Sequence, residues 1–270
     1  MHIASADGAR ASIALDGGHV MSWMPAGETD DRLFVSARSR FGAGEAIRGG
    51  IPVVFPQFGP FGDLPQHGFA RRCRWTIEDV SGPTLSAVGR LRLRLNDDAT
   101  TQAQWPHAFV AKLIVGVTAN SLTVALTVKN TDAAPFSFTA AFHPYFAVRD
   151  AFATRVEGLA GCRVRDSLHD GLVTEETASV LDIVGPLDRI YYDSPDRLFI
   201  RDGDRSMAIE KVGFPDAVVW NPGAEGVRAR TDFAEGEERL MLCVEAAVIQ
   251  QPITLVPGES WTGLQIMRAS

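Results

Sequence analysis

The chain has 270 residues and a formal net charge of −7, from 26 basic and 33 acidic side chains. This acidic balance argues against nucleic acid or an anionic membrane surface as the main partner, although it is compatible with a small basic pocket. A chain of this length can bury a large core without a disulfide or a structural metal.

The cysteines and the N-terminal segment are typical of a protein from a reducing compartment. Cys73, Cys162 and Cys243 lie far apart, and their spacing fits neither a zinc site nor a disulfide framework. The first residues lack the basic and apolar regions of a signal peptide, and no apolar run approaches the ~20 residues of a membrane span. We therefore expect a cytoplasmic, monomeric protein with no membrane partner.

In chain order the expected elements are almost all β-strands. Strands at 11–15 and 19–23 flank Asp16-Gly17-Gly18, which is a strong hairpin signal. The run RLRLRL at 90–95 alternates strictly, so its leucines should face the core and its arginines the solvent. Other strands are expected at 33–35, 109–117, 122–130, 136–142, 163–166, 198–201, 207–212, 217–220, 240–247 and 261–267.

Many strands joined by short turns, with no long amphipathic helix, indicate an all-β protein. The chain is more than twice as long as an immunoglobulin-type sandwich of about 100 residues, so either its sheets have many strands or a second domain is present. We favour one domain over residues 1–270, built as a large antiparallel β-sandwich. The segment 41–74 is different, because it is rich in glycine and proline and also in Phe, Val and Ile. Long irregular loops of this kind are often functional.

Glu245 is the most informative single residue. It lies within the apolar stretch LCVEA at 242–246, and strand alternation places it on the face opposite Val244. A buried carboxylate needs a partner or a chemical role, so Glu245 is either paired with an arginine inside the sheet or catalytic.

Two histidines stand out among the six. His67 lies inside the unusual loop, and His143 ends an apolar strand, where Pro144 fixes the backbone just after it. A strand end followed by a rigid turn can present one imidazole to a cleft, although a buried core histidine is the plainer interpretation. His67, His143 and Glu245 lack metal-ligand spacing, and the chain has no Gly-x-Ser-x-Gly nucleophile motif.

Six blocks occur in order along the chain. They are 48–59 (RGGIPVVFPQFG), 64–71 (LPQHGFAR), 143–146 (HPYF), 188–191 (DRIY), 218–222 (VVWNP) and 243–245 (CVE). Together they resemble the hexose-6-phosphate mutarotases, or glucose-6-phosphate 1-epimerases, within the aldose 1-epimerase superfamily. Two departures from the family pattern are Arg72, where Asn is usual, and Pro144, where Thr is common.

The resemblance implies a galactose mutarotase-like supersandwich with a cleft on one concave sheet. It implies that His143 is the general acid and Glu245 the general base. The substrate contacts that it implies are Arg48, Gln66, His67, Arg71 and Asp188. Arg72 either adds positive charge near the substrate or points to solvent, and Phe69 either stacks on a sugar face or belongs to the core.

Mutarotation opens a pyranose ring and closes it on the other face of C1, which needs one base and one acid but no metal or other cofactor. Ordinary pKa values make a Glu⁻/His⁺ pair accessible near neutral pH. Arg48 and Arg71 lie in the same loop region and could converge on a phosphate. We therefore expect an isomerase that interconverts the anomers of hexose 6-phosphates. The alternatives are an epimerase of unphosphorylated aldoses and a non-catalytic sugar-binding sandwich.

Overall fold

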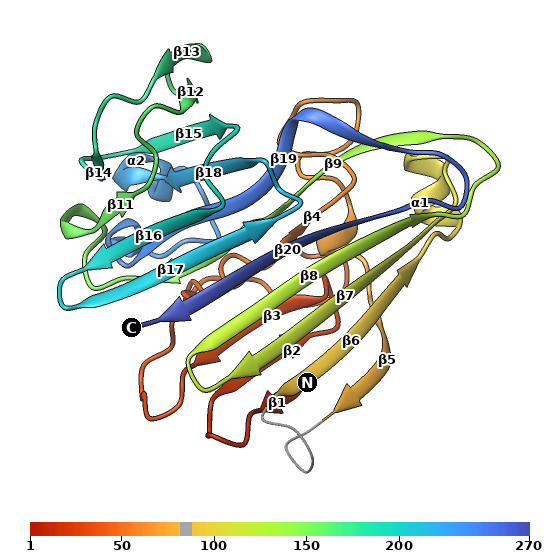
Figure 1. Ribbon diagram of the computed structural model, residues 1–270, viewed down its shortest axis with the longest axis horizontal. Coiled ribbons are helices and arrows are strands. Elements are labelled where there is room, and N and C mark those ends of the chain that lie inside the picture. Colours follow the sequence, from red (N-terminus) through yellow and green to blue (C-terminus); the bar gives the residue numbers. More distant parts are fainter. Residues whose placement is uncertain (82–87) are drawn as a thin grey trace.

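The computed structural model describes residues 1–81 and 88–270, and it consists mainly of two large antiparallel β-sheets with a small third sheet beside them (Figure 1). All pairings between named strands are antiparallel in the described part of the chain, as the sequence predicts, and the fold class is confirmed. The small sheet contains β1 (His2–Ala4), β2 (Arg10–Ala14) and β3 (His19–Met24).

Within the described residues, the first large sheet has nine strands. In sheet order they are β14 (Val180–Asp182), β11 (Arg155–Glu157), β16 (Arg197–Asp202), β17 (Arg205–Val212), β20 (Ser260–Ala269), β8 (Ser121–Asn130), β7 (Phe109–Thr118), β6 (Gly89–Asn96) and β5 (Thr76–Ser81). On β6 the leucines of the RLRLRL run are buried and Arg90 and Arg92 are exposed, so the expected alternation is confirmed.

The second large sheet has eight strands in the part of the chain that the structure describes, and it carries the residues of interest. In order they are β13 (Leu172–Glu175), β12 (Arg163–Asp166), β15 (Leu187–Tyr192), β18 (Asp216–Asn221), β19 (Met241–Leu255), β9 (Phe136–Phe142) and β4 (Val53–Val54), and β10 (Tyr145–Ala147) also pairs with β19.

The main hydrophobic core lies between the two large sheets. Inward residues of β6, β7 and β8 in one sheet pack with those of β9, β18 and β19 in the other. Burial of each large aliphatic side chain contributes about 1.5–3 kcal/mol. On β19, Leu242, Val244 and Ala246 point into this core, so Glu245 lies on the opposite face of the sheet, as the alternation predicts.

Helices are short and lie outside the sheets. They are α1 (Ala99–Gln104), α2 (Gly223–Arg228) and the 3₁₀ turns η1 (Ala70–Arg72), η2 (Ala151–Ala153) and η3 (Glu237–Arg239). Asp98 caps α1 by accepting hydrogen bonds from two backbone N–H groups of its first turn. No helix among the described residues is long and apolar enough to cross a bilayer.

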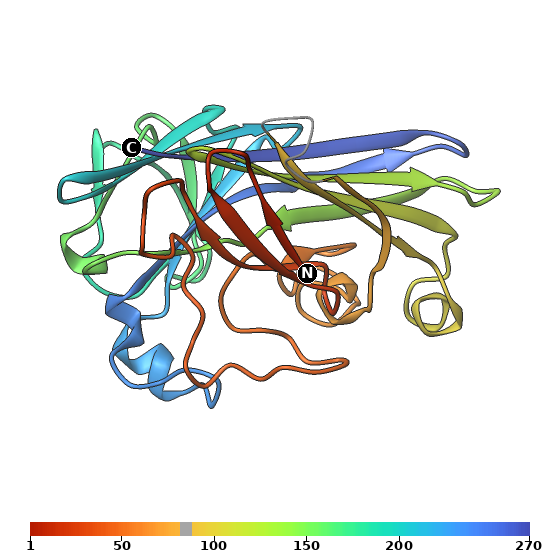
Figure 2. The ribbon, with the colours of Figure 1, turned by 90° about the horizontal axis from the view of Figure 1, so that it is seen from below.

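The irregular segment predicted at 41–74 is almost free of secondary structure, apart from β4 and η1. Figure 2 shows this segment, in orange, and α2, in blue, on the same side of the sheets. The two regions therefore approach each other although they are far apart in the sequence, and an ion pair between Arg48 and Asp232 joins them.

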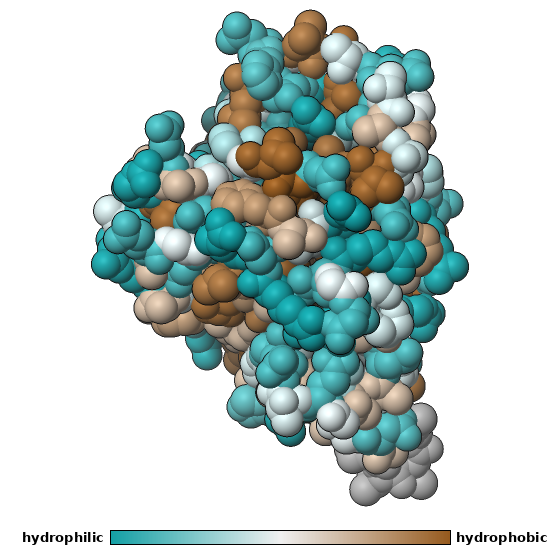
Figure 3. All heavy atoms as spheres, turned by 90° about the vertical axis from the view of Figure 1, so that its left-hand side faces the viewer, coloured by the Kyte–Doolittle hydropathy of each residue, from teal (hydrophilic) through white to brown (hydrophobic). Residues whose placement is uncertain are grey.

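Several strands differ from the prediction. β19 continues to Leu255, because its pairing with β9 resumes after an irregularity between Val248 and Ile253. The expected strand at 33–35 forms only isolated bridges, from Leu33 to Phe146 and from Val35 to Gly49. Edge strands such as β13 were not predicted, since all of its residues are exposed and lack a buried face. Figure 3 shows this end of the molecule, where hydrophobic groups are interspersed with hydrophilic ones.

Candidate active site

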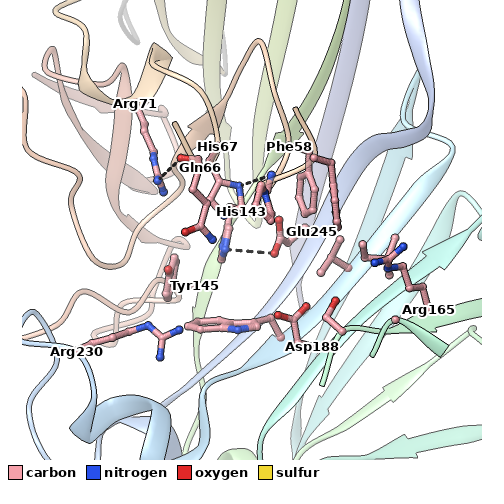
Figure 4. A pocket seen from close by; sticks show the side chains of 18 of the residues that line it. Phe58, Gln66, His67, Arg71, His143, Tyr145, Arg165, Asp188, Arg230 and Glu245 are labelled. Atoms are coloured by element: carbon pink, nitrogen blue, oxygen red, sulfur yellow. Dashed lines mark hydrogen bonds and ion pairs between the residues drawn. The ribbon is translucent and has the colours of Figure 1, made fainter. Parts of the chain in front are cut away.

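A cavity of about 440 Å³ opens on the face of the eight-stranded sheet that is turned away from the main core (Figure 4). Its wall includes all seven site residues expected from the sequence, which are Arg48, Gln66, His67, Arg71, His143, Asp188 and Glu245. The structure thus brings together residues that are separated by up to 197 positions in the chain (Arg48 to Glu245). Their chemical roles remain predictions.

Strand register brings His143 and Glu245 together. Phe142, the last residue of β9, pairs with Ala246 of β19, and β10 then pairs with the same strand. His143 lies in the short gap between β9 and β10, so its ring emerges beside Glu245. His143 Nε2 is 3.3 Å from Glu245 Oε1, and the two side chains point toward each other (Figure 4). The partner of Glu245 is therefore the imidazole of His143 and not an arginine, which was one of the two interpretations of its burial.

Burial perturbs both members of this pair. The relative exposure of His143 is 7% and that of Glu245 is 2%. Burial holds the pKa of His143 well below its ordinary value, and His67, Arg71 and Arg48 act in the same direction. Burial raises the pKa of Glu245 well above its ordinary value, with Asp188 acting in the same direction. Burial thus favours a neutral imidazole and a protonated carboxyl, in contrast to the charged pair expected from ordinary pKa values.

Aromatic rings surround His143. The Tyr145 ring stacks on it with centroids 4.9 Å apart and planes 11° apart. Trp220 and His67 make edge contacts at 5.8 Å and 5.6 Å. The Nδ1 atom of His143 is buried and has no hydrogen-bond partner in the described residues. The imidazole plane is therefore fixed mainly by packing.

A left-handed turn presents His67 to the cavity. His67 has a φ of 66° and Gly68 a φ of 65°, and a Cβ atom on Gly68 would lie only 2.3 Å from the carbonyl oxygen of Phe55. Only glycine fits there without strain. His67 Nδ1 accepts a hydrogen bond of 3.2 Å from the backbone N–H of Gly59, so the neutral ring carries its proton on Nε2. Burial lowers the pKa of His67 to about 3, which keeps the ring neutral.

Arg48 is tightly held by the protein itself. Its guanidinium forms an ion pair with Asp232 at 3.0 Å, donates a hydrogen bond of 2.8 Å to the Tyr145 hydroxyl, and lies 5.0 Å from the Phe233 ring centroid. Because Asp232 already balances its charge, Arg48 is less available to a substrate anion than the sequence suggests.

Arg71 contrasts with Arg48. It donates a hydrogen bond of 2.8 Å to the backbone oxygen of Gln66, and its Nε is buried without a partner. No carboxylate forms an ion pair with it in residues 1–81 or 88–270. The next residue, Arg72, is exposed and does not line the cavity, so the solvent-facing alternative holds for its side chain.

Asp188 projects from β15 on the Glu245 side of the cavity (Figure 4). Burial raises its pKa, while a hydrogen bond from Ser167 and the charge of Arg230 act the other way. A carboxyl group in this position can accept hydrogen bonds from hydroxyl groups of a ligand.

Several lining residues were not predicted as site residues, among them Phe58, Tyr145, Arg165, Trp220 and Arg230. Tyr145 and Trp220 do lie in the HPYF and VVWNP blocks, so alternation from His143 and a strand-end position could have indicated them. Arg230 lies in irregular chain after α2, where no pattern indicates a direction. Phe69 is buried in the core, as the plainer alternative predicted.

Comparison with known proteins identifies the family of this chain. The family model described as aldose 1-epimerase matches residues 1–268, so the chain belongs to the aldose 1-epimerase family. A protein of Cenchrus ciliaris named "Putative glucose-6-phosphate 1-epimerase" is 39% identical over 263 residues, which cover 94% of this chain and 79% of that protein. A protein of Escherichia coli K12 with the same name is 34% identical, over 88% of this chain and 79% of that protein.

Solved structures show the same fold. A crystal structure from Salmonella typhimurium described as a "putative mutarotase" superimposes with a TM-score of 0.90 at 27% identity, and the match covers 97% of this chain and 87% of that one. A galactose mutarotase-like protein from Lactobacillus casei gives a TM-score of 0.77 at 18% identity, over 100% of this chain and 99% of that one. The expected galactose mutarotase-like supersandwich is thereby confirmed.

Proposed function

We propose that the protein interconverts the α and β anomers of hexose 6-phosphates, with glucose 6-phosphate as the leading substrate. The observation that carries this proposal is the contact of 3.3 Å between His143 and Glu245 in the wall of the cavity. Membership of the aldose 1-epimerase family supports the reaction type, and the names of the relatives support the phosphorylated substrate.

The reaction requires an acid and a base at neighbouring points, because the anomeric hydroxyl O1 and the ring oxygen O5 are bound to the same carbon. Ionised Glu245 takes the proton from O1, and His143 gives its Nε2 proton to O5 as the C1–O5 bond breaks. The products of this step are the open-chain aldehyde, a protonated Glu245 and a neutral His143. Rotation about C1–C2 exposes the other carbonyl face, and the same transfers in reverse close the ring.

The perturbed pKa values suit such a relay. In water the proton would strongly prefer imidazole to carboxylate, since their ordinary pKa values are about 6.5 and about 4.3. Burial moves the two values toward each other, because it disfavours both charged forms. Neither group is then held in its charged form, which suits a reaction in which each of them gives and takes a proton in turn.

The covalent structure of the sugar orients the substrate. O5 is bound to C5, which carries C6, so the 6-phosphate extends from the side of the ring that His143 protonates. Arg71 lies on the His143 side of the pair, whereas Asp188 and the cation Arg165 lie on the Glu245 side (Figure 4). We therefore assign the phosphate to Arg71 and the hydroxyls near C2 to Asp188, with Trp220 available to pack on the ring.

Exchange spectroscopy by NMR tests this proposal directly, because it measures the interconversion of α- and β-glucose 6-phosphate at equilibrium. His143→Ala and Glu245→Gln should each slow the exchange by ~10²–10⁴-fold. Exposed residues of the same types serve as controls, and His2→Ala and Glu175→Gln should exchange at the wild-type rate. If both cavity variants retained wild-type exchange, the proposal would be wrong.

A further inference from the structure

The cavity wall contains a half-buried positive charge that forms no ion pair in the described residues. Burial lowers the pKa of Arg71 to about 10, and the charges of Arg72 and Arg48 act in the same direction, although Tyr145 and Glu245 oppose them. One guanidinium nitrogen donates to the backbone oxygen of Gln66, but the buried Nε has no hydrogen-bond partner in the described chain. Partial desolvation without an ion-pair partner is costly for a guanidinium, and a bound oxyanion would relieve that cost.

Charges are distributed unevenly about the catalytic pair. The groups that oppose protonation of His143 include the cations Arg71 and Arg48, whereas the carboxyl of Asp188 faces Glu245. On the cationic side, Asp232 is already engaged by Arg48 at 3.0 Å. Arg71 and Arg48 therefore form a positive end beside the acid, whereas Asp188 lies beside the base together with the cation Arg165.

This asymmetry affects where the shared proton resides. Ring opening starts from the arrangement in which His143 is protonated and Glu245 is ionised. The positive end of the cavity disfavours that arrangement, since it repels an imidazolium. The charge of Arg71 acts on both groups, but Arg71 lies on the His143 side of the pair (Figure 4). An anion bound there would therefore stabilise a proton on the imidazole more than a proton on the carboxyl.

We infer that the phosphate dianion of the substrate, bound by Arg71, drives the shared proton onto His143 and thereby activates ring opening in addition to providing affinity. This inference rests on the proposed function and deepens it. The phosphate takes part in no covalent step, because it acts only through its charge. The inference predicts that a dianion added separately from the sugar increases the activity of the enzyme toward an unphosphorylated sugar.

Other charged and titratable groups near His143 do not replace the phosphate. They are His67 from the 58–72 loop, Arg48 from the 41–50 loop, Tyr145 from β10, Glu245 from β19, Asp188 from β15, Arg165 from β12, Asp170 from the turn between β12 and β13, and Arg230 from the segment after α2. The acidic ones are Glu245, Asp188 and Asp170, and none of them forms an ion pair with Arg71. No described residue supplies an anion at the Arg71 end.

The test measures mutarotation of α-D-glucose by polarimetry with increasing sodium phosphite, at constant ionic strength and at a pH where the anion is doubly charged. The rate without enzyme at each phosphite concentration is subtracted, because the anion itself catalyses mutarotation. We expect kcat/KM for glucose to rise by about tenfold or more and to saturate. Both kcat and kcat/KM should be higher for glucose 6-phosphate than for glucose.

Adjacent arginines provide a matched pair of variants. Arg71→Ala should abolish the activation by phosphite, whereas Arg72→Ala should retain it, because Arg72 is exposed and lies outside the cavity wall. Competition by phosphite against glucose 6-phosphate shows independently that the anion enters the site.

Three results would overturn the inference: no effect of phosphite on glucose, inhibition alone, or activation that survives Arg71→Ala. None of these would contradict the proposed function if the wild-type protein still interconverts the anomers of glucose 6-phosphate. Failure of that interconversion in the wild-type protein would instead refute the function itself, so the two failures are distinguishable.

Discussion

His19 should make the protein sensitive to acid. It is 1% exposed, and its Nε2–H donates a hydrogen bond of 2.7 Å to the carbonyl oxygen of Gly49, next to Arg48. Its Nδ1 is buried without a partner in the described residues. Burial lowers the pKa of His19 to about 4. The hydrogen bond to Gly49 acts to raise this pKa, and the charge of Arg71 acts to lower it.

The size of the effect follows from this pKa. The folded-state value lies below the ordinary value of 6.5, so protonation favours the unfolded chain. The stability linked to His19 is complete above about pH 6.5 and is lost as the pH falls toward 4. A difference of about 2.5 in pKa corresponds to about 3 kcal/mol.

Urea denaturation at a series of pH values measures this loss. In His19→Gln the amide can donate to the same carbonyl but cannot take up a proton, so its free energy of unfolding should fall by about 3 kcal/mol less than that of the wild type between pH 7 and pH 4. His2→Gln, at an exposed position, should follow the wild type. Parallel pH profiles for the wild type and His19→Gln would refute this reasoning.

Three further predictions concern single positions. Gly50→Ala should lower the free energy of unfolding, measured by urea denaturation, by about 3 kcal/mol, because the new Cβ would lie 2.2 Å from a backbone oxygen at a φ of 59°. Gly8→Ala also places a side chain at positive φ but in open space, so it should lower the free energy of unfolding by only about 1 kcal/mol. Lys211→Met should lower the free energy of unfolding by about 3 kcal/mol, since the ammonium group donates to three carbonyls at 2.7–3.1 Å; an unchanged value would be contrary to this assignment. Trp220→Ala should raise KM for glucose 6-phosphate by about tenfold in steady-state assays, and Trp220→Phe by less, whereas equal KM values would exclude ring packing.

The sequence predicts those parts of the fold whose local pattern matches their burial. β6 shows it best, since three leucines alternate with outward polar groups on a sheet with one buried face. β5 could not be predicted in the same way, because it is an edge strand with every residue exposed. The second half of β19 was missed for a different reason, since its irregular pairing after Val248 interrupts the alternation.

The site was predictable as a set of residues but not as a geometry. His143 and Glu245 each break the apolar character of their strand, and the family resemblance connects them. Their contact depends on the pairing of β9 with β19, which is a long-range property. Local sequence also could not predict that Arg48 has an ion-pair partner and Arg71 does not, because Asp232 contacts Arg48 from a segment 184 residues away.

The central claim is that His143 and Glu245 act as one unit on a sugar's anomeric centre, and the double variant tests it most directly. Anomer exchange of glucose 6-phosphate is measured by NMR for the wild type, His143→Ala, Glu245→Gln and the combined variant. Groups whose two proton transfers occur in one transition state give non-additive losses, so the double variant should be about as slow as the slower single variant. Losses that multiply, or a double variant that exchanges at the wild-type rate, would contradict the claim.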